Sequence, residues 1–379
     1  MKNNRRNFIK KGTSLAALSV IGLGSAISVP IDYNDSKNAH GSESSARKES
    51  KKNVQWPVTE GPETPKICMN CGYNADEKGM RRVKQLGVNY VIMSGPRIPW
   101  TEADLRSTME RFKAGGLTVI NMMISGFNNT ILGREGRDAE IENIKKSVVA
   151  AGAAGLPVIE YNFYVNRLTA GYYPVEGRGG SGYLGFNYDP VRNLPPEPNT
   201  GAHSAEELWS NLTYFLKAVI PVAEKAGVRL ALHPNDPPAT VSHGSDQIMG
   251  SVKGWKRLIE IVDSPSNGIT FDCGVTRETG EDPIEVLRYF ATRDRINHQH
   301  FRNVNVEKPF EKYVEQFVDE GQVNMFAVMQ ELVRLKYKLG LFPEHPHGLD
   351  IDKEHGGDYT GYVYNVAYAR AMMQAVLSL

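Results

Sequence analysis

Short apolar runs alternate with longer amphipathic stretches from residue 54 to the C-terminus, about one pair every 30–45 residues. Eight of the apolar runs have the length of buried strands. They cover residues 66–71, 89–94, 117–124, 157–163, 228–233, 268–273, 296–301 and 338–345. Helical periodicity falls between several of them, at residues 103–116, 137–155, 205–227 and 324–340. Several of these stretches end at glycine, as helices often do.

Strands that alternate with helices pair in parallel through right-handed crossovers. Eight strands within about 320 residues favour a closed (β/α)8 TIM barrel over an open doubly wound sheet. We therefore predict an α/β fold with a single barrel domain over residues 56–379. Residues 166–203 are rich in Gly, Pro and Tyr, and a loop of this length usually covers a functional site or forms an interface.

Residues 1–30 resemble a bacterial Tat export signal. Arg5 and Arg6 precede a modest apolar run and then small residues suited to cleavage, and the run from Leu15 to Val29 is too weak for a stable membrane anchor. Residues 31–55 are polar and predict a flexible linker. We expect a periplasmic or otherwise exported protein, with no membrane association after signal removal. A disordered basic tail is the alternative.

Composition excludes several other classes of protein. At 379 residues and 41% apolar content, the chain can bury a large core and is not disordered throughout. The formal net charge is +1 and the 44 basic residues are dispersed, so we expect no nucleic-acid partner. Neither a GxGxxG nor a GxxxxGK[ST] motif follows the first strands, which argues against dinucleotide and P-loop nucleotide binding.

The three cysteines leave a choice open. Cys68 and Cys71 form a CxxC pair, and no second pair exists to complete a structural zinc site. Packing on the first strand is the favoured interpretation, with a disulfide in an oxidising compartment as the alternative. Cys273 belongs to a different part of the chain, at the end of a predicted strand.

Four predicted strands end in side chains that bind metals. His233 begins the loop HPNDPP, where prolines end the strand. The other three ends carry Asp272 or Cys273, His300, and Glu344 with His345 and His347. In a closed barrel these ends meet at one mouth, so they could share one ion. Imidazoles and carboxylates together suit Mn²⁺, Fe²⁺, Co²⁺ or Zn²⁺, and we expect Mn²⁺ or Fe²⁺.

Further residues are candidates for acid–base chemistry and substrate binding. His345 titrates near neutrality, and Tyr362 could lose its proton beside a cation or an arginine. Aromatic packing at a helix start is the alternative role for Tyr362. Arg302 could clamp a substrate carboxylate through two oxygens, or form a structural ion pair. Asn162 is a second substrate-binding candidate.

From about Trp100 onward, the chain resembles the mannonate dehydratase family of metal-dependent, xylose-isomerase-like barrels. The resemblance rests on residues 136–163, 206–238 and 262–274 and on the HFRNV of residues 300–304, in that order. It implies the removal of water from D-mannonate, giving 2-keto-3-deoxy-D-gluconate in hexuronate catabolism. It also implies a small sugar acid as partner and leaves open whether the chain forms a homo-oligomer.

The resemblance assigns the metal ligands to His233, Asp272, His300 and Glu344, and the catalytic histidine to His345. The family usually places a cysteine where Asp272 stands, with Cys273 one position later. Adjacent strand residues point to opposite faces, so we choose Asp272. Asn235 replaces an expected aspartate and Glu344 replaces another, and these departures put the substrate in question more than the fold.

Two other functions remain open. A metal-dependent sugar isomerase or epimerase of the xylose-isomerase-like kind would move hydrogen without releasing water. A binding module that has lost catalysis would hold a sugar acid without turning it over. Product analysis separates the three, because only a dehydratase yields a 2-keto-3-deoxy acid.

Overall fold

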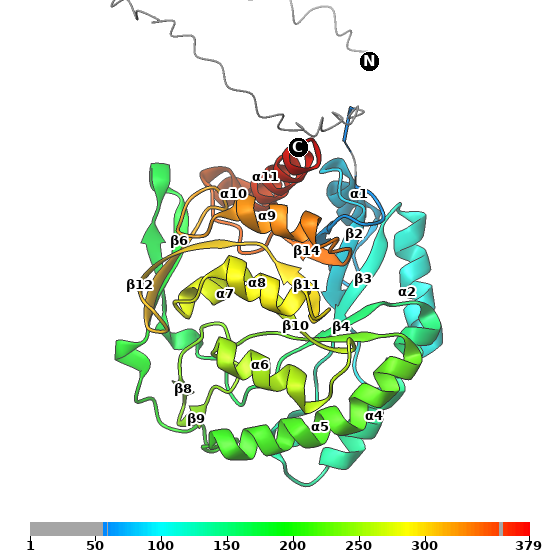
Figure 1. Cartoon of the computed structure of the whole chain (residues 1–379), viewed down its shortest axis with the longest axis vertical. Coiled ribbons are helices and arrows are strands. Elements are labelled where there is room, and N and C mark those ends of the chain that lie inside the picture. The colour runs from blue at the N-terminus through cyan, green and yellow to red at the C-terminus, as the bar shows by residue number, and fades with distance from the viewer. Residues whose placement is uncertain (1–55, 59, 356–358) are drawn as a thin grey trace, which may run out of the picture. The chain divides into compact units, whose positions relative to one another are not determined.

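The computed structural model describes residues 56–58, 60–355 and 359–379. Its centre is a closed barrel of eight parallel strands in the order β1-β2-β3-β4-β7-β10-β11-β14, with β14 pairing back onto β1 (Figure 1). The strands are β1 (Lys66–Asn70), β2 (Tyr90–Ser94), β3 (Thr118–Met123), β4 (Val158–Tyr161), β7 (Arg229–Leu232), β10 (Asn267–Asp272), β11 (Ile296–His300) and β14 (Gly340–Phe342). All eight predicted strands and the barrel fold are confirmed.

Helices surround the barrel, as Figure 1 shows. They are α1 (Glu77–Gln85), α2 (Glu102–Ala114), α3 (Asn128–Leu132), α4 (Arg137–Ala154), α5 (Ala205–Ala226), α6 (Val252–Ile261), α7 (Cys273–Glu278), α8 (Pro283–Ala291), α9 (Met325–Arg334), α10 (Asp350–His355) and α11 (Tyr359–Leu377). Local sequence sets their ends. Ser204 and Glu207 form a capping box at the start of α5, and Gly227 ends that helix with a φ of 69°.

The helix predicted over residues 324–340 is shorter in the structure. α9 ends at Arg334, and Lys336 has a φ of 55°, which stops the helical path. Tyr337 is then buried, and its hydroxyl donates to the carbonyl of Gly340 over 2.8 Å. The apolar residues after α9 therefore lead into β14 and do not prolong the helix.

A second sheet, which the sequence did not predict, lies outside the barrel. It is antiparallel, in the order β12-β13-β6-β5, and combines β5 (Tyr172–Glu176) and β6 (Gly182–Asn187) with β12 (Asn303–Lys308) and β13 (Lys312–Gln316). Two of these strands lie within residues 166–203, which had been expected to form a loop. The segment also contains the short helices η2 (Thr169–Gly171), η3 (Arg178–Gly180) and η4 (Asp189–Val191), and β8 (Val241–Ser242) pairs with β9 (Ser245–Asp246) nearby in sequence.

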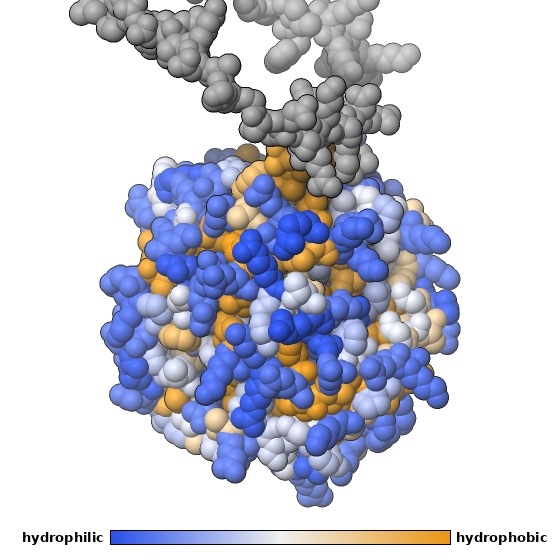
Figure 2. All heavy atoms as spheres, viewed as in Figure 1, coloured by the Kyte–Doolittle hydropathy of each residue, from blue (hydrophilic) through white to orange (hydrophobic). Residues whose placement is uncertain are grey.

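The two sheets have separate hydrophobic cores. The barrel and its helices share the larger one, whereas the added sheet packs around Phe186, Tyr313 and Leu168. On the face drawn in Figure 2, hydrophilic side chains predominate and hydrophobic ones lie scattered between them. Within the described residues, no helix is both long and apolar enough to span a bilayer.

All three cysteines are buried and carry free thiols. Cys68 lies on β1 and is fully buried, and Cys71 follows the same strand with 6% exposure. These positions agree with the packing interpretation of the CxxC pair and not with a disulfide. The predicted export signal (residues 1–30) and linker (residues 31–55) lie outside the described residues.

Candidate metal centre and active site

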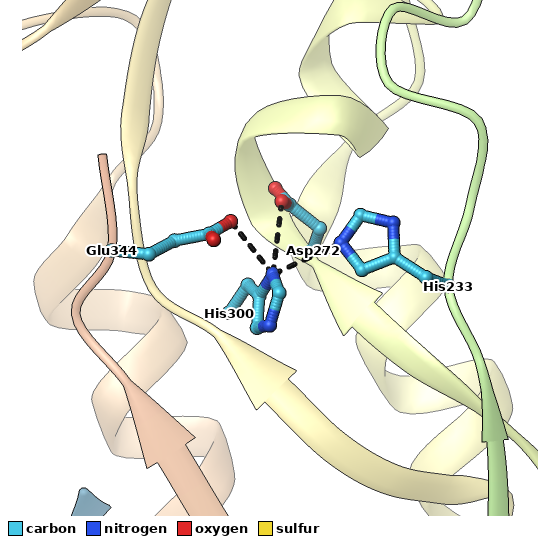
Figure 3. A group of neighbouring side chains, drawn as sticks. All are labelled: His233, Asp272, His300 and Glu344. Carbon is cyan, nitrogen blue, oxygen red and sulfur yellow. Dashed lines mark hydrogen bonds and ion pairs between the residues drawn. The ribbon is translucent and has the colours of Figure 1, made fainter. Parts of the chain in front are cut away.

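Four successive late strands bring the predicted ligands to the barrel mouth (Figure 3). Asp272 and His300 are the last residues of β10 and β11 and face each other in the strand register. His233 directly follows β7, and Glu344 lies two residues after β14. Because parallel strands end at one edge of a barrel, residues far apart in sequence become neighbours.

His300 lies at the centre of this group. Its Nδ1 is 2.6 Å from a Glu344 oxygen, 3.1 Å from Nε2 of His233 and 3.7 Å from an Asp272 oxygen. One ligand atom from each of the four residues lies within 4.8 Å of the others. Two imidazoles and two carboxylates that converge in this way fit a divalent transition metal by number and chemistry.

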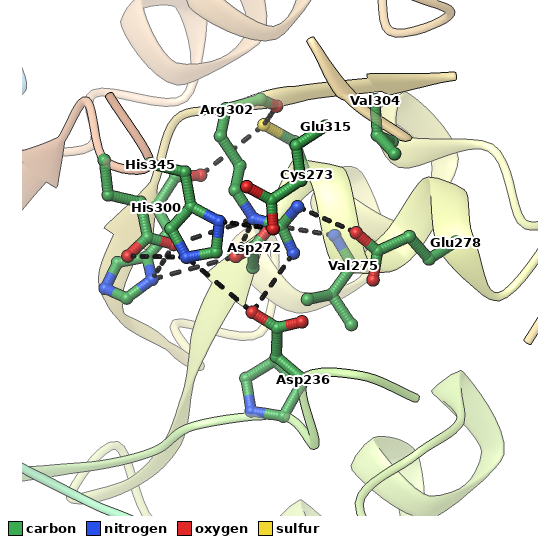
Figure 4. Close-up of polar contacts among 12 residues, drawn as sticks. Asp236, Asp272, Cys273, Val275, Glu278, His300, Arg302, Val304, Glu315 and His345 are labelled. Carbon is green, nitrogen blue, oxygen red and sulfur yellow. Dashed lines mark hydrogen bonds and ion pairs between the residues drawn. The ribbon is translucent and has the colours of Figure 1, made fainter. Parts of the chain in front are cut away.

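Arg302 lies behind Asp272 in a buried network of charges (Figure 4). Its Nε donates to Asp272 over 3.0 Å and its Nη1 donates to Glu278 over 2.7 Å. Burial opposes ionisation of Asp272, but Arg302 and His300 hold the pKa of that carboxyl well below its usual range. Asp272 is therefore a carboxylate at neutral pH, as a metal ligand must be.

A second group lies deeper in the barrel and shares His300. Glu160 on β4 is 3% exposed, and its two oxygens accept from Asn121 over 2.9 Å and Thr270 over 2.7 Å. Its Oε1 is 3.6 Å from Nε2 of His300. Burial would raise the pKa of Glu160, but His298 and His300 lower it to about 2. Glu160 therefore presents a negative charge to the far side of a metal-site imidazole.

His298 completes this deeper group. It is fully buried, and neither ring nitrogen has a hydrogen-bond partner among the described residues. Burial lowers its pKa to about 3, so the ring is neutral. Glu160, His298 and His300 also offer ligand atoms within 4.8 Å of one another.

A cavity of about 290 Å³ opens over the metal-site residues. His233, His300 and Glu344 line it, together with Glu160 and Asn162. Such a volume fits one small polar molecule, because small-molecule sites begin at roughly 300 Å³.

Comparisons with known proteins identify the family. The family model for D-mannonate dehydratase (UxuA) matches residues 201–378. A mannonate dehydratase from Thermotoga maritima is 30% identical over 314 residues, covering 72% of this chain and 87% of that protein. The chain belongs to the mannonate dehydratase family.

Other relatives agree with this membership. A mannonate dehydratase from Streptococcus suis (strain 05ZYH33) is 34% identical over 240 residues, and the match spans 56% of this chain and only 65% of that protein. The crystal structure of mannonate dehydratase from Streptococcus suis serotype 2 superposes with a TM-score of 0.74 at 26% identity, covering 83% of this chain and 95% of that one. A xylose isomerase domain protein from Planctomyces limnophilus shares the fold, with a TM-score of 0.54 at 16% identity.

The structure brings Asp272, and not Cys273, into the candidate metal cluster. Cys273 turns away, and its Sγ donates to the carbonyl oxygens of His300 over 3.5 Å and Arg302 over 3.2 Å. Burial and the neighbouring Asp272 raise the pKa of the Cys273 thiol to about 12. This thiol therefore stays protonated, and the cluster consists of nitrogen and oxygen ligands.

His345, for which the resemblance predicted a catalytic role, lies beside the candidate metal cluster. It lines the cavity, its Nδ1 is 2.9 Å from Glu315, and its Nε2 is 3.7 Å from Glu344. Burial lowers its pKa, but the carboxylates of Glu315 and Glu344 raise it to about 10. Its backbone φ of 47° is a strained conformation for a residue other than glycine, and such strain is concentrated at functional sites.

Two predicted roles do not fit the observed positions. Arg302 is 2% exposed, is bonded to buried carboxylates and does not line the cavity, so the structure corrects its role from substrate clamp to structural ion pair. Tyr362 on α11 stacks on Phe342 with ring centroids 6.0 Å apart, and it is not a cavity-lining residue either. Its position favours aromatic packing over proton transfer.

Sequence reasoning missed several polar side chains that line the cavity, among them Arg167 and Tyr164. The Arg167 side chain is 46% exposed, and its Nε donates to the carbonyl of Asp236 over 2.8 Å. Burial raises the pKa of Tyr164, which keeps its hydroxyl protonated. Their closeness to the end of β4 was the available signal, because active-site residues follow barrel strands.

Proposed function

We propose that the protein is a metal-dependent hydro-lyase that removes water from D-mannonate to give 2-keto-3-deoxy-D-gluconate. The observation that carries this proposal is the convergence of His233, Asp272, His300 and Glu344 under a small polar cavity, in a chain of the mannonate dehydratase family. The metal is Mn²⁺ or Fe²⁺, which accept mixed imidazole and carboxylate ligands.

The reaction makes two demands on the site. A proton must leave the carbon beside the carboxylate, and hydroxide must leave the next carbon, after which the enol product becomes the keto acid. The divalent cation, when bound, stabilises the negative charge that develops on the substrate carboxylate.

The side chains around the cavity then have distinct tasks. Arg167 binds the substrate carboxylate, since its half-exposed guanidinium lines the cavity and presents several donors. His345, after releasing its own proton to solvent, accepts the proton from the carbon beside the carboxylate, and Tyr164 donates one to the departing hydroxide because burial keeps it protonated. Asn162 contributes a hydrogen bond to a substrate hydroxyl.

Anaerobic turnover of the Mn²⁺-loaded chain with D-mannonate tests this proposal. We expect metal-dependent formation of a 2-keto-3-deoxy acid, which the His233→Ala control does not produce. Tyr164→Phe and His345→Asn should each lower kcat by about 100-fold or more, whereas Tyr362→Phe should change it little. Binding of D-mannonate without any turnover would contradict the dehydratase and favour the binding module.

A metal-dependent isomerase or epimerase is the second candidate. The observation that favours it is the ligand set itself, since Asp272 replaces the family's cysteine and leaves a site of Asp, Glu and His. Such an enzyme would convert a sugar into an isomer of the same mass. Mass spectrometry of the product therefore separates the two reactions, because only the dehydratase product is lighter by one water.

We also propose export through the Tat pathway, supported by the twin arginines Arg5 and Arg6. Replacing both by lysine should retain the protein in the cytoplasm of a bacterial host. Equal distribution of the two forms between cell fractions would contradict export by this route.

A further inference from the structure

A groove of about 600 Å³ lies beside the cavity over the metal site. Arg167 and His345 line both spaces, so the groove and the cavity meet at these two side chains. The cavity holds about 290 Å³, enough for one small molecule. The adjoining space is therefore available to a substrate that extends beyond a single sugar acid.

The walls of the groove come from the added sheet and from the loop after β14. Tyr172 on β5 and residues 182–184 on β6 form one side, and Pro346 and His347 form another. Two backbone hydrogen bonds between Gly182 and Gly348, of 2.8 and 3.2 Å, fasten this loop to the sheet. The groove thus exists because residues outside the barrel build a wall beside its mouth.

The lining combines aromatic rings with polar groups. His347 is 3% exposed, its ring packs 4.5 Å from that of Tyr183, and its Nε2 has no hydrogen-bond partner among the described residues. Leu184 is 39% exposed and supplies an apolar contact. Glu315 and Thr169 add oxygens. A sugar ring suits such a lining, because its C–H face packs on apolar groups while its hydroxyls find donors and acceptors.

We propose that the groove binds a glycosyl unit attached to the distal part of the sugar acid, so that the substrate class is a glycosylated aldonic acid. This inference rests on the proposed function in that the acid end occupies the cavity. The metal-site residues and Arg167 hold the carboxylate end, which directs the other end of the chain outward. A glycosyl group on a carbon far from the carboxylate can then reach the groove past His345.

Calorimetric binding to the Mn²⁺-loaded full chain tests the proposal. The ligands are D-mannonate, 4-O-mannosyl-D-mannonate and 6-O-mannosyl-D-mannonate. At least one glycosylated acid should bind tenfold or more tightly than D-mannonate. Gly182→Leu should remove this advantage and leave D-mannonate affinity within twofold, since a Cβ at Gly182 lies 3.8 Å from its nearest neighbour and strains nothing. Tyr173→Leu on β5, outside the groove, is the matched control and should keep the advantage.

Other outcomes overturn the proposal. It fails if neither glycosylated acid binds more tightly than D-mannonate, if none of the three binds, or if Gly182→Leu weakens all three equally. Failure of the dehydratase is distinguishable, because binding is measured apart from product. A chain that binds the glycosylated acids in a Gly182-dependent way but releases no water retains the groove and loses the proposed reaction.

Discussion

The two sheets of this protein contribute different residues around the candidate metal site. The parallel barrel carries the metal-site residues on the ends of its strands, and its strand register places Asp272 opposite His300. The antiparallel sheet contributes Tyr172 and Tyr183 to the groove beside that site. The barrel thus supplies the candidate metal-site residues, and the added sheet forms one wall of the groove beside them.

The two sheets also differ in how clearly the sequence predicts their strands. β10 is buried at every position, as strands of a parallel sheet covered on both faces are. β5 is half-buried or exposed along its whole length and is stabilised mainly by its partners. The barrel strands were therefore predictable one by one, while the added sheet needs pairing between residues more than 100 positions apart.

The largest effect should come from the barrel, with Asp272→Asn. This change removes a metal ligand and leaves the Arg302 charge buried with one partner fewer. We expect the metal dissociation constant to rise by more than about 100-fold. The free energy of unfolding should fall by about 3–5 kcal/mol. Metal titration measures the dissociation constant, and denaturant unfolding measures the free energy of unfolding.

Glu278→Gln is the matched control, because Glu278 contacts the same guanidinium without belonging to the metal cluster. Burial raises the pKa of Glu278 to about 8, and the amide oxygen of a glutamine can accept the Arg302 hydrogen bond in place of the Glu278 oxygen. The free energy of unfolding should fall by about 1 kcal/mol or less, and the metal affinity should not change. Equal losses in the two variants would show that Asp272 acts only through Arg302.

Phe186→Ala tests the independence of the added sheet. Phe186 is fully buried, with its ring 5.2 Å from Tyr172 and 5.3 Å from Tyr313. Loss of the ring should destabilise this sheet by about 3 kcal/mol and leave metal affinity intact, because the barrel has its own core. Leu184→Ala, an exposed position on the same strand, should cost about 0.5 kcal/mol or less. Parallel loss of metal binding in Phe186→Ala would mean that the sheets are not separable.

Glu160→Gln should have an intermediate effect within the barrel. The Glu160 carboxylate lies 3.6 Å from the second nitrogen of His300, too far for a hydrogen bond, so its negative charge acts on the ring through space. We expect metal affinity to fall by about 10–100-fold, with one ion bound per chain before and after the change. His298→Gln should leave the stoichiometry at one. If the wild type instead binds two ions per chain and each variant binds one, the deeper group is a second metal site.

The smallest effect should appear at Glu331 on α9, which belongs to neither sheet. Hydrogen bonds from Arg288 over 2.7 Å and Arg334 over 2.6 Å lower the pKa of this carboxyl from 4.5 to about 2. Because the folded pKa is depressed, the stabilisation is complete above pH 4.5 and disappears as the pH falls towards 2. Glu331→Gln should lower the free energy of unfolding by about 1 kcal/mol or less at pH 7, because both arginines are half-exposed. Near pH 2 the substitution should leave the free energy of unfolding unchanged. A loss of stability that does not depend on pH would show that Glu331 stabilises the fold through packing and not through its charge.

The sequence predicted the metal-site residues because each stands at or next to the end of a predicted strand. His233 precedes a proline-rich loop, and Asp272 and His300 end strands of buried residues. A barrel brings such ends together whatever their separation in the chain. Position and residue type therefore predicted the four strand ends, while the family resemblance was needed to choose Glu344 as a ligand over the neighbouring histidines.

Side-chain partners could not be predicted in the same way. Arg302 has the right chemistry for a substrate clamp, but ion pairs with four acidic residues from different parts of the chain hold it in a buried position. Glu160 stands within an apolar run, and only the barrel interior shows that it faces His300. These roles depend on which neighbours the fold supplies, and a single sequence does not contain that information.

Anomalous scattering from crystals of the Mn²⁺-loaded chain would test the central claim most directly. The account predicts one strong peak at the barrel mouth, bounded by His233, Asp272, His300 and Glu344, and its absence in Asp272→Asn. A peak confined to the deeper group of Glu160 and His298, or no peak at saturating Mn²⁺, would contradict it.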